Sequence, residues 1–311
     1  MKKVFQACGL CGKNDFKFLF ANFDHLTKKD EYFNLVKCKC CGLVQINPKP
    51  KDIEEYYYES YSPYNPPKKD FYISFYRNLI KSYYKKKKTP VDLVKSALCG
   101  VLYFQPVARP GRVFDIGCGN GGYLSILKDC GWDVYGLDFS QKAVDFVKNK
   151  RGLINIKQGS AEKLDFPDNF FDLVTMNHLI EHLSDPKKSL YEAKRVLKKG
   201  GILMITTPNF SSLNAKIFGG NWFPLETPRH LFLFETKTLR NFIDQVGNLK
   251  ITKIRYDYST YCLAKSLGYL FGDRPLLNQF LMIVKIFFLP YTLLLSLLGC
   301  SDIITIYGQK Q

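Results

Sequence analysis

Apolar positions after Pro110 fall into short runs, and stretches with helical periodicity separate these runs. Each run suits a buried strand, and each intervening stretch places its apolar residues on one face of a helix. We expect strands at Arg112–Ile116, Asp133–Asp138, Asn155–Gln158, Asp172–Met176 and Gly201–Thr206. We expect helices at Gly121–Cys130, Gln141–Lys148 and Pro186–Leu197, with Asp185 as an N-cap and Gly200-Gly201 as a stop. This alternation predicts an α/β fold with parallel strands and crossover helices.

The chain beyond residue 230 extends this pattern. A helix is expected at Lys237–Val246, with strands near Lys250–Asp257 and Asp302–Tyr307. The last strand should run antiparallel beside Gly201–Thr206. We therefore predict a Rossmann-like, seven-stranded sheet whose last strand is antiparallel.

An apolar stretch lies between the last two strands. Residues 280–298 are long and apolar enough for a transmembrane helix, but Lys285 and Pro290 interrupt them. A full span would also leave the last strand across the bilayer. We expect instead an apolar helical insertion at 262–300, whose helical pair at 276–300 either packs on the domain or lies in a membrane interface.

Composition divides the rest of the chain. Residues 1–50 carry paired cysteines and form a candidate metal-binding module, and residues 51–105 form a connector rich in tyrosine and proline, followed by helices. The basic run at 85–88, broken by Pro90, is interpreted as a solvated turn between two helices. Residues 106–311 then form the α/β domain.

Charge and the N-terminus bear on partners and location. A formal net charge of +17 favours an anionic partner, such as RNA, a nucleotide-linked substrate or an acidic lipid surface, without choosing among them. Met1-Lys2-Lys3 leads into no apolar signal-peptide core, so we expect a cytoplasmic protein.

A glycine-rich turn is the strongest chemical motif. It runs Asp115-Ile116-Gly117-Cys118-Gly119-Asn120-Gly121, between an expected strand and a helix. Glycines let the backbone approach a ligand closely. The next strand ends at Asp138, about 20 residues on, the spacing at which a carboxylate reaches ribose hydroxyls. Together the two elements predict a nucleoside site.

Residues 110–250 resemble the class I S-adenosylmethionine methyltransferases, whose first motif is Asp-x-Gly-x-Gly-x-Gly. The resemblance implies that Asp115 orients the cofactor's ammonium group and that Asp138 binds its ribose. Gly159-Ser160-Ala161-Glu162 stands where the family has Gly-Asp-Ala against the adenine, with Ser160 as a departure. The implied cofactor-binding set is Asp115, Gly117, Gly119, Gly121, Asp138, Phe139, Ser160, Ala161 and Asn177.

The segment His178-Leu179-Ile180-Glu181-His182 follows the fourth expected strand. If the turn is helical, its three polar side chains share one face. The segment resembles the Glu-x-x-Glu-His of ubiquinone-pathway and small-RNA O-methyltransferases, which implies a catalytic role for His178, Glu181 and His182 and a divalent metal at the active site. The alternative is that Glu181 and His182 only cap and pack.

A second candidate segment, Trp222–Leu231, ends in Pro-Arg-His-Leu and resembles an insertion of methyltransferases encoded with polysaccharide pathways. We expect His230 to converge with His182 over the transferred methyl group. A neutral imidazole there suits deprotonation of an acceptor hydroxyl. The alternative is a structural histidine bonded to loop backbone.

The cysteine pairs predict a structural zinc site. Cys8, Cys11, Cys38 and Cys41 form two Cys-x-x-Cys knuckles, each followed by glycine, whereas Cys40 is an extra thiol. Four thiolates leave no open coordination position, so we expect folding support and no catalysis. A nucleic-acid-reading zinc ribbon is the alternative. Similar zinc modules precede sugar C-methyltransferases.

These observations predict a zinc-module methyltransferase that acts on a hydroxyl, or a carbon, of a sugar or lipid-linked glycan intermediate. Peripheral contact with the inner face of the membrane is also expected. The rival enzyme is an RNA methyltransferase, although the Asn/Asp-Pro-Pro-aromatic motif of base-amine methylation is missing after the fourth strand. The rival from another class is a noncatalytic scaffold that binds only the cofactor or zinc.

Overall fold

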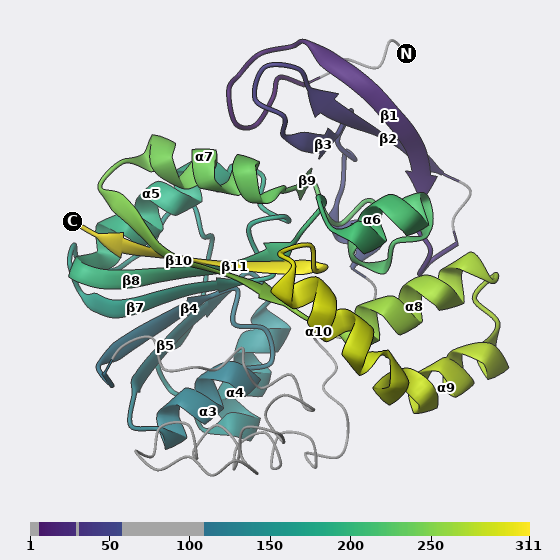
Figure 1. The fold of residues 1–311 in the computed structure, drawn as a ribbon. Helices are drawn as coiled ribbons and strands as arrows, with labels where there is room; N and C mark the ends of the chain where they lie inside the picture. Colours follow the sequence, from purple (N-terminus) through teal and green to yellow (C-terminus); the bar gives the residue numbers. More distant parts are fainter. Residues whose placement is uncertain (1–5, 29–30, 58–108) are drawn as a thin grey trace.

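The computed structural model describes residues 6–28, 31–57 and 109–311, and Figure 1 shows how they are arranged. Their strands form a seven-stranded sheet in the order β10-β11-β8-β7-β4-β5-β6 and a four-stranded sheet in the order β1-β2-β3-β9. The helices and the basic turn expected within 71–102 lie outside the described residues.

The large sheet confirms the predicted α/β fold. Its parallel strands are β4 (Arg112–Ile116), β5 (Asp133–Asp138), β6 (Ile156–Gln158), β7 (Phe171–Asn177) and β8 (Leu197–Pro208). The last strand, β11 (Ile303–Lys310), runs antiparallel between β8 and β10 (Leu249–Asp257). Observed strand bounds differ from the predicted ones mainly at β8, whose pairing continues past both predicted ends.

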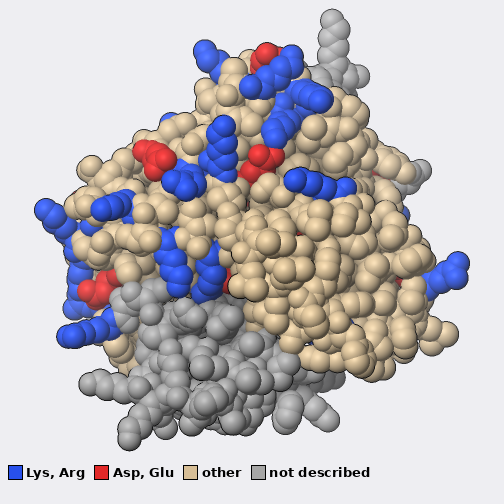
Figure 2. Space-filling view, in the orientation of Figure 1, with Lys and Arg blue, Asp and Glu red and all other residues tan. Residues whose placement is uncertain are grey.

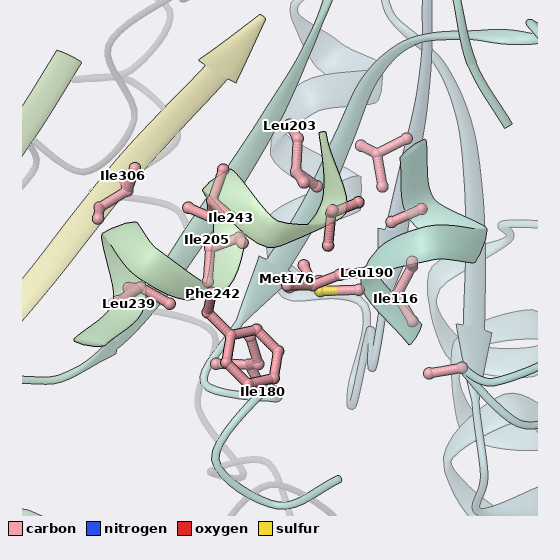
Figure 3. Close-up of a cluster of buried hydrophobic side chains, with 14 of the residues drawn as sticks. Ile116, Met176, Ile180, Leu190, Leu203, Ile205, Leu239, Phe242, Ile243 and Ile306 are labelled. Carbon is pink, nitrogen blue, oxygen red and sulfur yellow. The ribbon is translucent and has the colours of Figure 1, made fainter. Parts of the chain in front are cut away.

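Helices cover both faces of this sheet. One face holds α3 (Gly122–Asp129) and α4 (Gln141–Arg151), and the other holds α5 (Pro186–Val196) and α7 (Thr236–Val246). Figure 3 shows side chains from α5 and α7 packed against sheet residues such as Leu203 and Ile205. Full burial of a leucine or isoleucine contributes about 1.5–3 kcal/mol, so the amphipathic periodicity of these segments is what folds them onto the sheet.

Local signals fix the helix starts. The Asp185 side chain accepts a hydrogen bond from the Lys188 amide at 3.0 Å, which confirms the predicted N-cap of α5. The Ser140 hydroxyl does the same for α4 through the Ala143 amide.

The small sheet joins the cysteine-bearing segment to the α/β domain. It comprises β1 (Phe16–Phe23), β2 (Tyr32–Cys38), β3 (Val44–Ile46) and β9 (Phe232–Leu233), and a short 3-10 helix at Glu54–Tyr56 follows. Because β9 belongs to the Pro-Arg-His-Leu segment, β3 pairs antiparallel with a strand that lies almost 190 residues later, Val44 opposite Leu233. Residues of the cysteine knuckles and of β9 share one hydrophobic core.

The remaining helices lie beyond the end of the large sheet at which β10 ends and β11 begins (Figure 1). They are α6 (Leu213–Phe218), α8 (Thr260–Leu270), α9 (Pro275–Val284) and α10 (Leu289–Leu297), with 3-10 turns at Gly219–Asn221, Phe223–Leu225 and Lys285–Phe288. The predicted helical pair at 276–300 corresponds to α9 and α10, and α8 precedes it within the predicted insertion.

Candidate functional site

The glycine turn lies at the carboxyl ends of β4 and β5. Gly117, Gly119 and Gly121 all have positive φ, which an L side chain rarely adopts. The Gly117 and Cys118 amides donate to the Leu137 carbonyl at 2.7 and 3.0 Å, and this ties the turn to the end of β5. A Cβ on Gly117 would lie 2.8 Å from the Leu179 side chain, so the turn also needs glycine for space.

Gly121 has a different role from its two neighbours. A Cβ there would lie 2.7 Å from Val147 of α4, and Gly121 does not line the three cavities beside the glycine turn. Its amide donates to the Cys118 carbonyl, and it is the residue before α3. Gly121 is one of the residues predicted to bind the cofactor. In the structure, its lack of a side chain lets α4 pack closely beneath the turn.

Two buried carboxylates flank this turn. Asp138 accepts hydrogen bonds from the Gly119 amide at 2.8 Å and the Ser140 amide at 3.0 Å, one on each oxygen. A carboxylate offers about four acceptor positions, so each oxygen can accept a further ligand hydroxyl. Burial raises its pKa, although these amides oppose that rise.

Asp115 is the second carboxylate, and it accepts from the Thr175 hydroxyl at 2.6 Å and the Asn177 amide at 3.3 Å. Burial raises its pKa to about 7 against the effect of these two donors. A cation bound beside Asp115 would favour the charged carboxylate, so this position suits a positively charged ligand group.

Three cavities meet at the glycine turn. The first, about 430 Å³, is lined by Asp138, Phe139, Ser160, Ala161 and the apolar side chain of Leu179. The second cavity, of about 320 Å³, contains Asp115, Gly119 and Asn177 among its lining residues. The third, about 430 Å³, shares Gly117 and Asp138 with the first and Asn177 with the second.

The third cavity contains the histidines predicted to be catalytic. His178, His182 and His230 line it, together with aromatic side chains from distant segments, Tyr57, Phe223 and Tyr261. The ring centroids of His182 and His230 lie 4.6 Å apart, and the two rings meet edge to face. The structure thus brings these two residues together as predicted, although they lie 48 positions apart in the sequence.

The segment around Glu181 forms hydrogen-bonded turns and no helix, so the condition under which its three polar side chains would share one helical face is not met. His178 has a positive φ of 49°, which turns the chain at the end of β7. Its Nδ1 nevertheless lies 3.4 Å from Glu181 Oε1, and the other carboxylate oxygen accepts from the Thr207 hydroxyl at 2.9 Å.

Hydrogen bonds to backbone fix the tautomers of the two central histidines. His230 Nδ1 lies 2.8 Å from the Pro224 carbonyl, and His182 Nδ1 lies 3.0 Å from the Arg229 carbonyl. Because a carbonyl oxygen only accepts, each Nδ1 carries the proton and each Nε2 keeps its lone pair. The Tyr57 hydroxyl also lies 2.9 Å from His182 Nδ1.

Burial keeps these imidazoles neutral. Desolvation lowers the pKa of both His182 and His230 to about 4, and the proximity of the two rings adds to the shift at His182. Burial would raise the pKa of Glu181, but the His178 contact and the neighbouring imidazoles lower it to about 2. Desolvation opposes the charged form of His178, yet Glu181 raises its pKa above the ordinary value.

A buried ion pair holds the loop between these histidines. Arg229 donates to both carboxylate oxygens of Asp24 at 2.8 and 2.9 Å, and both side chains are 1% exposed. Arg229 also donates to the Tyr56 carbonyl at 3.2 Å. Asp24 follows β1, so the cysteine-bearing segment positions the backbone that binds His182.

Sequence reasoning missed Asp24, Tyr57, Phe223, Glu226 and Tyr261, all of which contact or line the site. Tyr57 is one of several adjacent tyrosines in the connector, and nothing local distinguishes it from the others. Asp24 and Arg229 approach each other only in the fold. Arg229 belongs to the Pro-Arg-His-Leu motif, and that motif was the one sequence feature that could have pointed to this ion pair.

The four predicted zinc ligands converge as predicted. The sulfur atoms of Cys8, Cys11, Cys38 and Cys41 lie within 4.8 Å of one another, with Cys8–Cys41 at 3.4 Å and Cys11–Cys38 at 3.5 Å. A tetrahedral zinc with Zn–S bonds of about 2.3 Å separates its thiolates by about 3.8 Å, close to these distances. Cys40 is exposed and stands apart from the cluster.

Comparison with known proteins identifies the central segment. Residues 114–205 match the methyltransferase domain family model. A demethylmenaquinone methyltransferase of Renibacterium salmoninarum is 40% identical over 99 residues, or 32% of this chain and 42% of that protein. An ajmaline N-methyltransferase of Rauvolfia serpentina is 32% identical over 123 residues, or 37% and 42% of the two chains. These matches span less than half the length of either relative.

Solved structures similar to this chain include that of an S-adenosylmethionine-dependent methyltransferase of Archaeoglobus fulgidus. It is 21% identical, with a TM-score of 0.47, over 78% of this chain and all of that one. The YcgJ protein of Bacillus subtilis is 19% identical, with a TM-score of 0.47, over 70% of this chain and 99% of that one.

Proposed function

We propose that this chain is an S-adenosylmethionine-dependent methyltransferase that methylates a hydroxyl of a sugar or glycan intermediate, with a carbon acceptor as the alternative. The observation that carries the proposal is the position of Asp138. It lies beside the glycine turn, at the boundary between an apolar cavity and the cavity that contains His182 and His230. A donor held by Asp138 would therefore face a neutral base.

The residues around the glycine turn fit this cofactor. The apolar side chains of Leu137, Phe139 and Leu179 suit a purine ring, and Asp138 retains acceptor capacity for ribose hydroxyls. Asp115, with its raised pKa, suits an ammonium group in the adjoining cavity. S-Adenosylmethionine, when bound, supplies an electrophilic sulfonium methyl group.

His230 is our candidate general base. Its Nδ1 proton is committed to the Pro224 carbonyl, so the lone pair on Nε2 can accept the proton of an acceptor hydroxyl. Phe223 and Tyr261 line the same cavity and offer flat apolar surfaces to a sugar ring. The walls of this cavity would hold the acceptor in line with the methyl group, which accounts for much of the rate in such reactions.

A divalent cation is a further component of this proposal. Glu181, His182 and His230 offer ligand atoms within 4.8 Å of one another, and buried Glu181 Oε1 accepts no hydrogen bond beyond its 3.4 Å contact with His178 Nδ1. Two neutral imidazoles and one carboxylate suit a transition metal. These residues would then bind an acceptor oxygen through the metal, and His230 would be a ligand in place of a base.

Replacing Asp138 with alanine is expected to weaken binding of S-adenosylhomocysteine at least about 100-fold. Two charge-assisted hydrogen bonds of about 1.5–3 kcal/mol each would be lost. Calorimetric titration measures the effect, and Asp145→Ala, an exposed carboxylate on α4, is the matched control. Unchanged affinity in Asp138→Ala would contradict the assignment of the donor site.

The cysteine cluster is proposed to bind one structural zinc ion per chain. Cys8→Ser is expected to lose the metal and destabilise the small sheet, because the knuckles share its core. Cys40→Ser, which changes an exposed thiol outside the cluster, should keep the zinc. Elemental analysis of purified protein tests both, and wild type without zinc would refute the proposal.

A further inference from the structure

The segment from α9 to α10 exposes an apolar face to solvent. Its members recur at helical spacing along α9, continue through the 3-10 turn that follows and extend along α10 to the next residue: Leu276, Phe280, Ile283, Phe287, Leu294, Leu297 and Leu298. Exposure reaches 82% at Leu276, 79% at Phe287 and 85% at Leu297. Helices on the surface of a domain normally turn polar residues outward, so this pattern requires an explanation.

Core packing does not explain the apolar face. Within Pro275–Leu297 the most apolar window of 18 residues has a mean hydropathy of 2.1, yet only 22% of that window is buried. The side of the segment that packs against the domain uses other residues, the buried Leu281, Leu289 and Leu295.

Topology excludes a single crossing of the bilayer by this segment. β10 ends at Asp257 and β11 begins at Ile303, and these two residues are register partners in adjacent antiparallel strands. The chain therefore leaves the sheet and returns to it at one place. A single crossing would put β11 on the far side of the membrane, whereas β11 pairs along its length with β8 and β10. The apolar face can meet a bilayer only by lying parallel to its surface.

Charge around the apolar face favours an anionic surface. Between residues 260 and 300 the basic residues are Lys265, Arg274 and Lys285. The one acidic residue there, Asp273, already pairs with Lys28 at 3.3 Å. Figure 2 shows a broad area with few charged side chains over α8 to α10. A second copy of the chain would bring the same basic residues together, whereas anionic lipid would complement them.

We propose that the apolar face docks onto an anionic membrane, with α9 and α10 lying in the plane of the interface. Leu276, Ile283 and Phe287 would enter the boundary between headgroups and acyl chains, while the basic residues contact lipid phosphates.

The docking surface is connected to the acceptor cavity by α8. Tyr261 and Cys262, in the first turn of α8, line that cavity, whereas Leu270 and Phe271 at its other end are exposed next to α9. Eleven residues of helix span about 16 Å. If the proposed methyltransferase function holds, the acceptor would be a molecule with its polar end in the cavity and its apolar tail in the membrane.

The test is co-sedimentation of the full chain with vesicles of phosphatidylglycerol and phosphatidylcholine, compared with phosphatidylcholine alone. We expect binding to the anionic vesicles, weakened but not abolished by high salt because the apolar contribution is not screened. Phe287→Glu should reduce partitioning at least about tenfold, and Phe287→Ala should reduce it less. The matched control is Ile154→Glu, which alters an equally exposed apolar residue (81%) outside the apolar face and should bind like wild type.

Two results would overturn the docking proposal. One is a wild-type chain that ignores anionic vesicles. The other is a dimer in light scattering that Phe287→Glu dissociates, which would assign the apolar face to a second copy. S-Adenosylhomocysteine affinity, measured on the same variants, should be unchanged. A variant that loses vesicle binding but keeps its affinity for S-adenosylhomocysteine shows that the altered residue acts only in membrane docking. A wild-type chain that does not bind S-adenosylhomocysteine would refute the proposed function without affecting the docking proposal.

Discussion

Replacing His230 with glutamine is expected to lower kcat for methyl transfer by about 10²–10⁴-fold, the range that general base catalysis contributes. Nε2 of His230 is unprotonated because Nδ1 donates to the Pro224 carbonyl, and glutamine offers no comparable base. The measurement is transfer of labelled methyl groups to the acceptor fraction that the wild type modifies. His25→Gln is the matched control, because His25 stacks on Tyr269 and does not line the cavity of the other histidines.

The pH profile separates His230 from its neighbour His178. Burial lowers the pKa of His230 to about 4, and a base is active only when unprotonated. The rate should therefore stay level as pH falls from 8 to about 5 and decline as pH approaches 4. A midpoint at or above 6.5 would contradict the assignment and point to His178 or Asp115, whose pKa values are both raised. An equal loss of S-adenosylhomocysteine affinity in His230→Gln would indicate a structural role instead.

Replacing Asp24 with asparagine is expected to lower the free energy of unfolding by about 3–5 kcal/mol, because the Arg229 guanidinium would remain buried without its counter-charge. The same change should lower kcat, since the Arg229 carbonyl orients His182. Denaturant unfolding gives the stability, and methyl transfer at a permissive temperature gives the rate.

The control for Asp24 is Asp165→Asn, which removes an exposed ion pair with Lys157 and should leave unfolding unchanged. A loss below about 1 kcal/mol in Asp24→Asn would show that water or another group compensates Arg229. Full stability with a reduced rate would assign the ion pair to orientation of His182 alone.

Local patterns by themselves determined the proposed donor-binding half of this protein. The glycine turn and Asp138 could be predicted because β4, the turn, α3 and β5 are consecutive, and each follows from neighbours a few positions away. Asp185 was recognisable as an N-cap for the same reason. The cysteine pairs also carried their own signal, since each knuckle closes through a short-range hydrogen bond, Gly12 to Cys8 and Gly42 to Cys38.

Only the tertiary structure decided the proposed acceptor-binding half. Tyr57, His182 and His230 meet because β9 adds to the small sheet and Arg229 pairs with Asp24, and these contacts join residues about 200 positions apart. The outward exposure of the apolar face was equally undetermined, since an apolar helix has the same sequence pattern whether a core or a bilayer covers it. Local sequence encodes turns, caps and strand periodicity, whereas packing between distant segments depends on the shape of the whole chain.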